Sequence, residues 1–160
     1  MEGELPILQR RRIEAEVIRP IYEELAVEVG EERARAVLAR AIERAAIAAG
    51  ASFAERTEGG TSLETFRDLY ELWTHDGALE IEVHRADAER FDFDVTRCRY
   101  AEMYRELGLG ELGSILSCNR DGVFCTGYDP RIRLERTRTL MQGAPSCDFR
   151  YELVEDDAAG

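Results

Sequence analysis

Two cysteines and an aspartate lie close together in the segment SILSCNRDGVFCTGYDP, which runs from Ser114 to Pro130. If this segment is helical, Cys118, Asp121 and Cys125 recur at i, i+3 and i+7 and share one helix face. The two cysteines would then lie roughly 10 Å apart along the axis, whereas a disulfide needs Cα atoms within about 7 Å. A disulfide is therefore the weakest of four interpretations. The other three are a metal site, a nucleophile and plain core packing.

The remaining cysteines lie at predicted junctions between elements, since Cys98 precedes a helix and Cys147 begins a strand. Thiolates from three separated segments, Cys98, Cys118 and Cys147, could hold a zinc ion and leave its fourth position for water. Glu102 lies four residues after Cys98 on the same helix face, where it could serve that water as general base. Alternatively one thiol is a nucleophile, or all of them pack in the core as small apolar groups.

Local signatures do not choose between these interpretations. The sequence has neither a CxxC nor an HxxxH motif, which are the short patterns typical of metal and redox sites. Its two histidines, His75 before an aspartate and His84 on the polar face of a predicted strand, are interpreted as surface residues.

Apolar spacing predicts where the elements lie. Helical spacing covers residues 7–29, 31–50, 63–73, 98–108 and 111–125, and strand-like alternation covers 79–84, 91–96, 131–140 and 147–153. Pro20 predicts a kink or a fresh helix start, Gly50 a helix end and Gly108 a C-cap. The order helices-β-β-α-α-β-β indicates an α+β fold, with N-terminal helices packed against an antiparallel sheet of about four strands. We expect a single domain over residues 1–160, mainly helical over 7–75 and carrying the cysteine motifs over 76–154.

Charge and hydropathy limit the partners. Lys+Arg is 21 and Asp+Glu is 33, so the net charge of −12 argues against nucleic acid and against a basic membrane-binding face. No apolar run approaches the roughly 18–20 residues that span a bilayer, and MEGELPILQRRR lacks the apolar core of a signal peptide. We expect a cytoplasmic protein with reduced thiols and no nucleotide cofactor. The Ala-rich face of residues 34–48 allows close helix packing and suggests a homodimer.

The C-terminal half resembles a known family over about residues 91–151. The segments that carry the resemblance are FDVTRCRYAEMYRELGLGELGSILSCNRD and YDPRIRLERTRTLMQGAPSCDFRY. They resemble the L-2-amino-thiazoline-4-carboxylic acid hydrolase family and, more remotely, small-molecule-binding domains of the 4-vinyl-reductase type, which are α+β and often dimeric. The positions that match are Cys98, Glu102, Cys118, Asp121, Gly143, Cys147, Asp148 and Phe149. Cys125 matches no family position and is interpreted as core packing.

The resemblance implies hydrolysis of a cyclic, amidine-like C–N bond. Water would add to the ring carbon between sulfur and the two nitrogens, and ring opening would leave an S- or N-carbamoyl cysteine. Glu102 or Asp121 would act as base and acid, with water polarised by a cysteine-bound metal, or Cys147 would add covalently. The substrate carboxylate would be bound by an arginine fork. The candidates are Arg97, Arg99, Arg136 and Arg138.

Three functions remain open at this point, because a fold does not determine an activity. An enzyme predicts that the three cysteines converge with at least one carboxylate in an open pocket. A sensor of a small molecule or metal predicts a pocket without a water-activating group, or a closed metal site. An assembly domain predicts dispersed cysteines and a large apolar interface.

Overall fold

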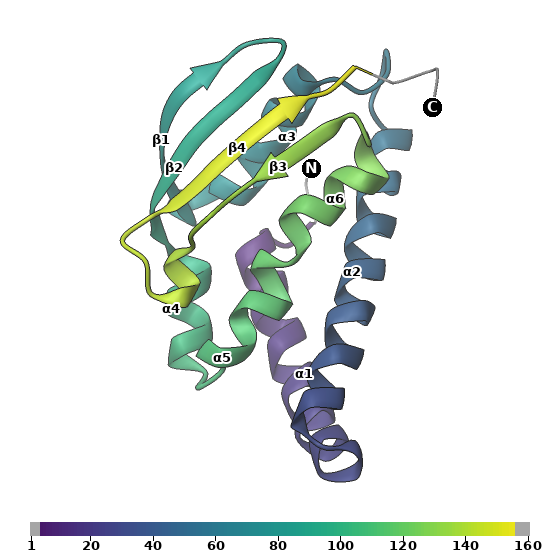
Figure 1. The fold of residues 1–160 in the computed structure, drawn as a ribbon, viewed down its shortest axis with the longest axis vertical. Helices are drawn as coiled ribbons and strands as arrows, with labels where there is room; N and C mark the ends of the chain where they lie inside the picture. Colours follow the sequence, from purple (N-terminus) through teal and green to yellow (C-terminus); the bar gives the residue numbers. More distant parts are fainter. Residues whose placement is uncertain (1–3, 156–160) are drawn as a thin grey trace.

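The computed structural model describes residues 4–155 and has the predicted α+β architecture, with helices packed against one four-stranded antiparallel sheet (Figure 1). In chain order the elements are α1 (Ile7–Val29), α2 (Glu31–Glu55), α3 (Leu63–Thr74), the 3-10 turn η1 (His75–Gly77), β1 (Leu79–Ala86), β2 (Arg90–Cys98), α4 (Arg99–Glu106), α5 (Gly110–Gly113), the π-helical turn η2 (Ser114–Cys118), α6 (Arg120–Tyr128), β3 (Ile132–Glu135), the 3-10 turn η3 (Leu140–Gln142) and β4 (Cys147–Leu153). No helix in this part of the chain is both long and apolar enough to span a membrane.

The sheet has the order β1-β2-β4-β3, and its inner face is aromatic. Alternation along β2 and β4 turns Phe93 and Val95 to the same side as their cross-strand partners Phe149 and Cys147. Helices α3 and α6 cover this side, and their aromatic side chains complete a buried cluster with it. The outer face is charged, and Arg150 is paired with Asp94 across it. Cys147, the first residue of β4, lies at one end of this aromatic core.

Helices α2 and α6 cross at very close range because each has a glycine at the contact. A Cβ atom on Gly50 would overlap the carbonyl oxygen of Phe124, and a Cβ atom on Gly127 would overlap the carbonyl oxygen of Ile47. The prediction that Gly50 ends its helix is thus wrong, since α2 continues to Glu55. Packing of α6 against Gly50 outweighs the low helix propensity of glycine.

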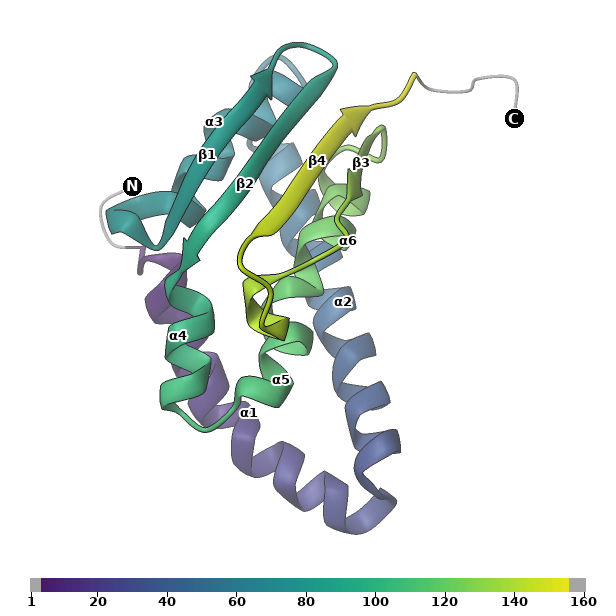
Figure 2. The same cartoon turned by 60° about the vertical axis from the view of Figure 1, so that its left-hand side comes forward.

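The N-terminal helices form a hairpin that extends away from the sheet (Figures 1 and 2). Helix α1 runs through Pro20 without a fresh start. The Ala-rich face of α2 is used inside the chain, because Ala34, Ile42 and Ala46 are all buried there. Other residues of the same face, such as Val37, Ala41 and Ala45, are exposed, so the face is only partly used inside the chain and the homodimer stays a prediction.

The segment predicted as one helix over 111–125 is divided into α5, η2 and α6. Its centre is a π-helical turn, closed by a hydrogen bond from the amide of Asn119 to the carbonyl of Ser114 at 2.7 Å. Turns of this kind are rare and occur frequently at functional sites. Here the turn ends with Cys118 and leads directly into the helix that bears Asp121. By contrast α4 ends as predicted, with Gly108 at φ 72°.

Candidate functional site

Three of the four cysteines line one small enclosed cavity between the sheet, α4 and the π-helical turn. Cys98 comes from the end of β2, Cys118 from the end of the turn and Cys147 from the start of β4. The cavity has a volume of about 40 Å³, enough for water but not for a ring-sized ligand. Asp121 also lies in its wall. Three thiols from separate segments and one carboxylate thus line the same cavity, and their roles stay predictions.

Two of these sulfur atoms accept backbone hydrogen bonds. The sulfur of Cys98 caps the N-terminus of α4 by accepting from the amide of Ala101 at 3.4 Å, and that of Cys147 accepts from the amide of Leu140 at 3.1 Å. Burial nevertheless raises the pKa of Cys98 to about 11, and it also raises the pKa values of Cys118 and Cys147. In the free protein the thiols are therefore protonated near neutral pH.

The predicted zinc site is not supported by the positions of the side chains. Within residues 4–155, no group of three His, Cys, Asp or Glu side chains is arranged to hold a metal ion. The zinc site therefore stays a prediction from the sequence. The fourth cysteine, Cys125, is buried in the core cluster of α3, α6 and the sheet and does not line the cavity, in agreement with its interpretation as packing.

Asp121 forms a short ion pair in the wall of the cavity. Its Oδ2 accepts a hydrogen bond from Nη1 of Arg136 at 2.6 Å, and Nη2 of the same guanidinium donates to the carbonyl of Cys118 at 3.1 Å. The guanidinium also lies 5.0 Å from the ring centre of Phe149. Burial raises the pKa of Asp121 above its ordinary value, although Arg136 opposes the shift. The result is a carboxylate held in a fixed orientation and more basic than one in water.

Four of the residues predicted for the site lie outside this cavity. Glu102 is exposed and paired with Arg97 at 2.9 Å, and this hydrogen bond lowers the pKa of Glu102. Arg99 donates to the carbonyl of Asp76 on the surface, and Arg138 is also exposed. The prediction for Glu102 relied on its helical spacing from Cys98 and did not foresee that Arg97 would bind its carboxylate. We assign these four side chains no role in the cavity.

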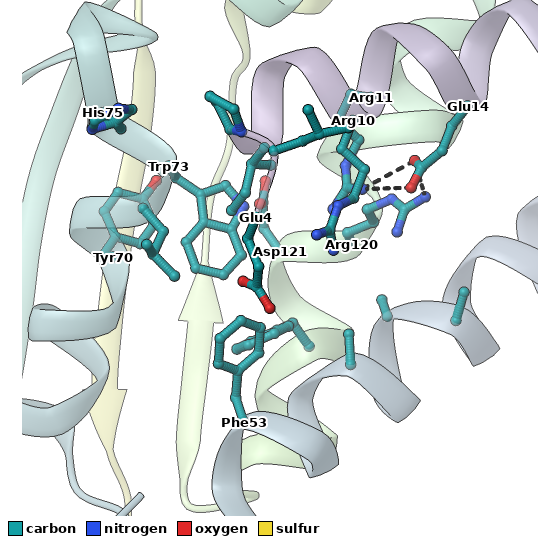
Figure 3. A pocket seen from close by; sticks show the side chains of 18 of the residues that line it. Glu4, Arg10, Arg11, Glu14, Phe53, Tyr70, Trp73, His75, Arg120 and Asp121 are labelled. Carbon is teal, nitrogen blue, oxygen red and sulfur yellow. Dashed lines mark hydrogen bonds and ion pairs between the residues drawn. The ribbon is translucent and has the colours of Figure 1, made fainter. Parts of the chain in front are cut away.

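A much larger pocket adjoins the small cavity. Its volume is about 490 Å³, and it lies between the start of α1 and helices α2, α3 and α6 (Figure 3). Five residues line both hollows: Arg11, Tyr70, Trp73, Arg120 and Asp121. The large pocket has aromatic walls on one side, from Phe53, Phe66, Tyr70, Trp73 and Phe124. Its shape and lining are typical of a small-molecule site.

The opposite side of the large pocket is charged. Arg11 and Arg120 both bind the carboxylate of Glu14, at 3.0 and 3.2 Å, so two guanidinium groups meet beside Asp121. In Figure 3 the carboxylate of Asp121 points into the pocket, between Trp73 and Arg120. Sequence reasoning missed Arg11 and Arg120, because on a helix they look like members of a solvated face. The only local signal was that Arg120 directly precedes Asp121.

Both histidines are exposed, as predicted: His75 lies beside Asp76 at 3.3 Å and His84 beside Asp94 at 3.2 Å. Asp148 likewise has the structural role expected from its strand parity. It faces away from the cavity and accepts hydrogen bonds from the amides of Thr137 and Arg138.

The fold and its two adjoining hollows define an α+β domain with an internal pocket between helices and sheet. The chain belongs to the L-2-amino-thiazoline-4-carboxylic acid hydrolase family, whose sequence model matches residues 10–151. The resemblance seen in the sequence is thereby confirmed, and it extends over the N-terminal helices. A comparison with curated protein sequences found no match.

The solved structures that are similar to this chain include the following two. The phenol-responsive sensory domain of the transcription activator PoxR, with phenol, has a TM-score of 0.53 and 14% identity, over 86% of this chain and 73% of that one. Subunit 3 of a trafficking protein particle complex from Naegleria fowleri, covalently bound to palmitic acid, has a TM-score of 0.46 and 12% identity, over 90% and 97%. At such identity the first likeness shows a common fold and nothing more.

Proposed function

We propose that the protein hydrolyses a C–N bond in a small cyclic amidine that carries a carboxylate, of the aminothiazoline-carboxylate type. Membership of the hydrolase family supports this reaction class. The observation that carries the proposal is the position of Asp121, which lines both hollows. One hollow has room for a water molecule and the other for a heterocycle, so this carboxylate adjoins both reactants.

In the proposed reaction Asp121 acts first as base and then as acid. It takes one proton from water while the water oxygen bonds to the ring carbon between sulfur and the two nitrogens, and it passes this proton to the ring nitrogen. The hydroxyl of the tetrahedral intermediate then loses its proton to Asp121 as the C=O bond forms and the ring C–N bond breaks, and Asp121 gives this proton to the departing nitrogen. One water is consumed, and S-carbamoyl cysteine results. A carboxylate whose pKa lies above its ordinary value is suited to both transfers.

Arginines have two different roles in this proposal. Arg136 orients Asp121 through their ion pair, and it is therefore a positioning residue. Arg11 and Arg120 lie at the charged side of the large pocket, where a guanidinium fork can bind the substrate carboxylate. Water is favoured over Cys147 as the attacking group, because burial raises the pKa of this thiol and leaves little thiolate.

A second candidate function is the binding of a small molecule without chemistry. The observation that favours it is the size of the large pocket, about 490 Å³, which exceeds what a single five-membered ring needs and falls in the usual range of ligand pockets. Its aromatic and cationic sides would fit an apolar or aromatic molecule that carries an anionic group. In that case Asp121 and the thiols would only help to shape the pocket.

The two candidates are separated by measuring binding and turnover on the same protein. Trp73 lines both hollows and is the only tryptophan of the chain, so its fluorescence reports occupancy. With aminothiazoline carboxylate as the probe, we expect saturable quenching and release of S-carbamoyl cysteine in the wild type. Asp121→Asn should lower turnover by roughly 10²–10⁴-fold while quenching persists. Glu102→Gln, a carboxylate-to-amide change outside the cavity, is the matched control and should keep the wild-type rate.

Each outcome has a separate meaning. Quenching without turnover in the wild type would favour the binding function and refute the hydrolase. Wild-type turnover in Asp121→Asn would refute the role of Asp121. If aminothiazoline carboxylate neither quenches nor reacts, it is not a ligand of the pocket, and the proposed substrate class is wrong.

A further inference from the structure

Helix α1 has a second apolar face that nothing in the chain covers. Ile13, Val17 and Ile21 are 47%, 58% and 61% exposed and recur every four residues, so they form one continuous stripe. The core of the chain is contacted from the opposite side of the helix, by residues such as Ala15 and Ile18. Three large apolar side chains aligned in water form a patch of the kind that marks an interaction surface.

Opposite charges flank this stripe. Arg10 precedes Ile13 by three residues and Glu24 follows Ile21 by three, so both lie on the same helix face as the stripe. Within residues 4–155 neither has an ion-pair partner. Other arginines of α1, at positions 12 and 19, each pair with a glutamate four residues further on. Among the described residues Glu28, near the end of α1, also has no ion pair, but Arg10 and Glu24 are the two that lie directly beside the ends of the stripe.

We propose that α1 of a second copy of this chain packs antiparallel on this stripe, around a twofold axis at Val17. In that arrangement residues whose numbers sum to 34 face each other. Val17 meets its own copy, Ile13 meets Ile21 of the second copy, and Arg10 meets Glu24 of the second copy. Every apolar residue of the stripe then has an apolar partner, and Arg10 and Glu24 each face an opposite charge. A surface that complements itself in this way is the requirement for a twofold dimer.

The charge pattern selects this occupant over others. A parallel pair would set Arg10 against Arg10 and Glu24 against Glu24, which is repulsive at both ends. A uniformly acidic or basic partner would match only one end of the stripe. The interface would also adjoin the ligand pocket, because Arg10 lies in the wall of the large pocket.

The test is the mass of the chain in solution, measured by light scattering across a range of concentrations. We expect wild type at twice the chain mass of 18.2 kDa. Val17→Glu should be monomeric, because it sets two carboxylates against each other on the axis. Val83→Glu, at a site 49% exposed on edge strand β1, is the matched control and should remain dimeric. Circular dichroism should show both variants folded, since each side chain is exposed in the monomer.

Charge exchange tests the antiparallel register directly. Arg10→Glu and Glu24→Arg should each weaken dimerisation by roughly tenfold or more, about 1.4 kcal/mol for each factor of ten. The double variant should recover to near the wild-type value, because each exchanged charge again faces its opposite. The proposal is overturned if wild type stays monomeric at roughly 0.1 mM, if folded Val17→Glu remains dimeric, or if the double variant is no better than the single ones.

Discussion

The close crossing of α2 and α6 leads to a prediction in which one substitution has opposite effects at two places in the same helix. Gly127 and Gly122 both lie in α6. At Gly127 an added Cβ atom would overlap the carbonyl oxygen of Ile47, whereas at Gly122 it would meet nothing within 4 Å. The obstacle at Gly127 is backbone, so a rotamer change cannot relieve it.

The two magnitudes follow from these surroundings. Overpacking of a close contact costs about 1–3 kcal/mol, and a backbone obstacle should put Gly127→Ala near the upper end. In a chain of this size that corresponds to a loss of roughly 6–12 °C in melting temperature. Gly122→Ala adds only helix propensity, so it should be neutral or stabilise by up to about 1 kcal/mol.

Urea unfolding followed by far-UV circular dichroism measures both variants under the same conditions. Asp121 lies on the same helix, so a shift of α6 away from α2 should also lower turnover in Gly127→Ala while Gly122→Ala keeps it. If the free energies of unfolding of the two variants agree within about 0.5 kcal/mol, the helices do not cross at the distance described and the reasoning fails.

Three further predictions concern single groups. Burial raises the pKa of Cys98 to about 11, so its thiolate fraction at pH 8 should be roughly a hundredfold below that of a free cysteine. Peptide mapping after treatment with iodoacetamide should therefore show slow labelling of Cys98, and rapid labelling would contradict this prediction. Burial raises the pKa of Asp148, but hydrogen bonds from Thr137 and Arg138 outweigh it and leave the pKa at about 2. The stability from these bonds should be lost as pH falls from about 4 to 2, and Asp148→Asn should unfold in urea with a flatter pH profile over that window. Elemental analysis of protein purified without chelator should find well under one zinc per chain, whereas one zinc per chain that is absent from Cys118→Ser would restore the metal interpretation.

Helices and strands could be predicted from the sequence where the local residue pattern and the packing in the folded chain favour the same structure. The alternation of Phe91, Phe93 and Val95 with charged residues identified a half-buried strand, and the pairing of β2 with β4 follows that parity. Gly50 was misread because glycine commonly ends helices, while here it is needed for contact with a helix more than seventy residues later in the sequence. Such a contact has no signature in either helix alone.

The composition of the site was predictable only in part, for a related reason. Cysteines attract notice by their type, so Cys98, Cys118 and Cys147 could be grouped before their positions were known. Arginines could not be sorted this way among so many charged residues, since what distinguishes Arg136 is its ion pair with Asp121. Burial of that pair depends on the whole packing of α6 against the sheet.

The same distinction explains why Asp121 and Glu102 differ although both are carboxylates on helices beside cysteines. Glu102 is in water, and its arginine partner lowers its pKa, so it is a poor base. Asp121 is mostly shielded from water, and its arginine partner opposes but does not reverse the rise in pKa that burial causes. An exposed guanidinium and a largely buried one therefore lead to different chemistry at the carboxylate. If Asp121→Asn and Glu102→Gln had equal effects on turnover, this difference in surroundings would not control the reaction, and the carboxylate assignment made from burial would have to be abandoned.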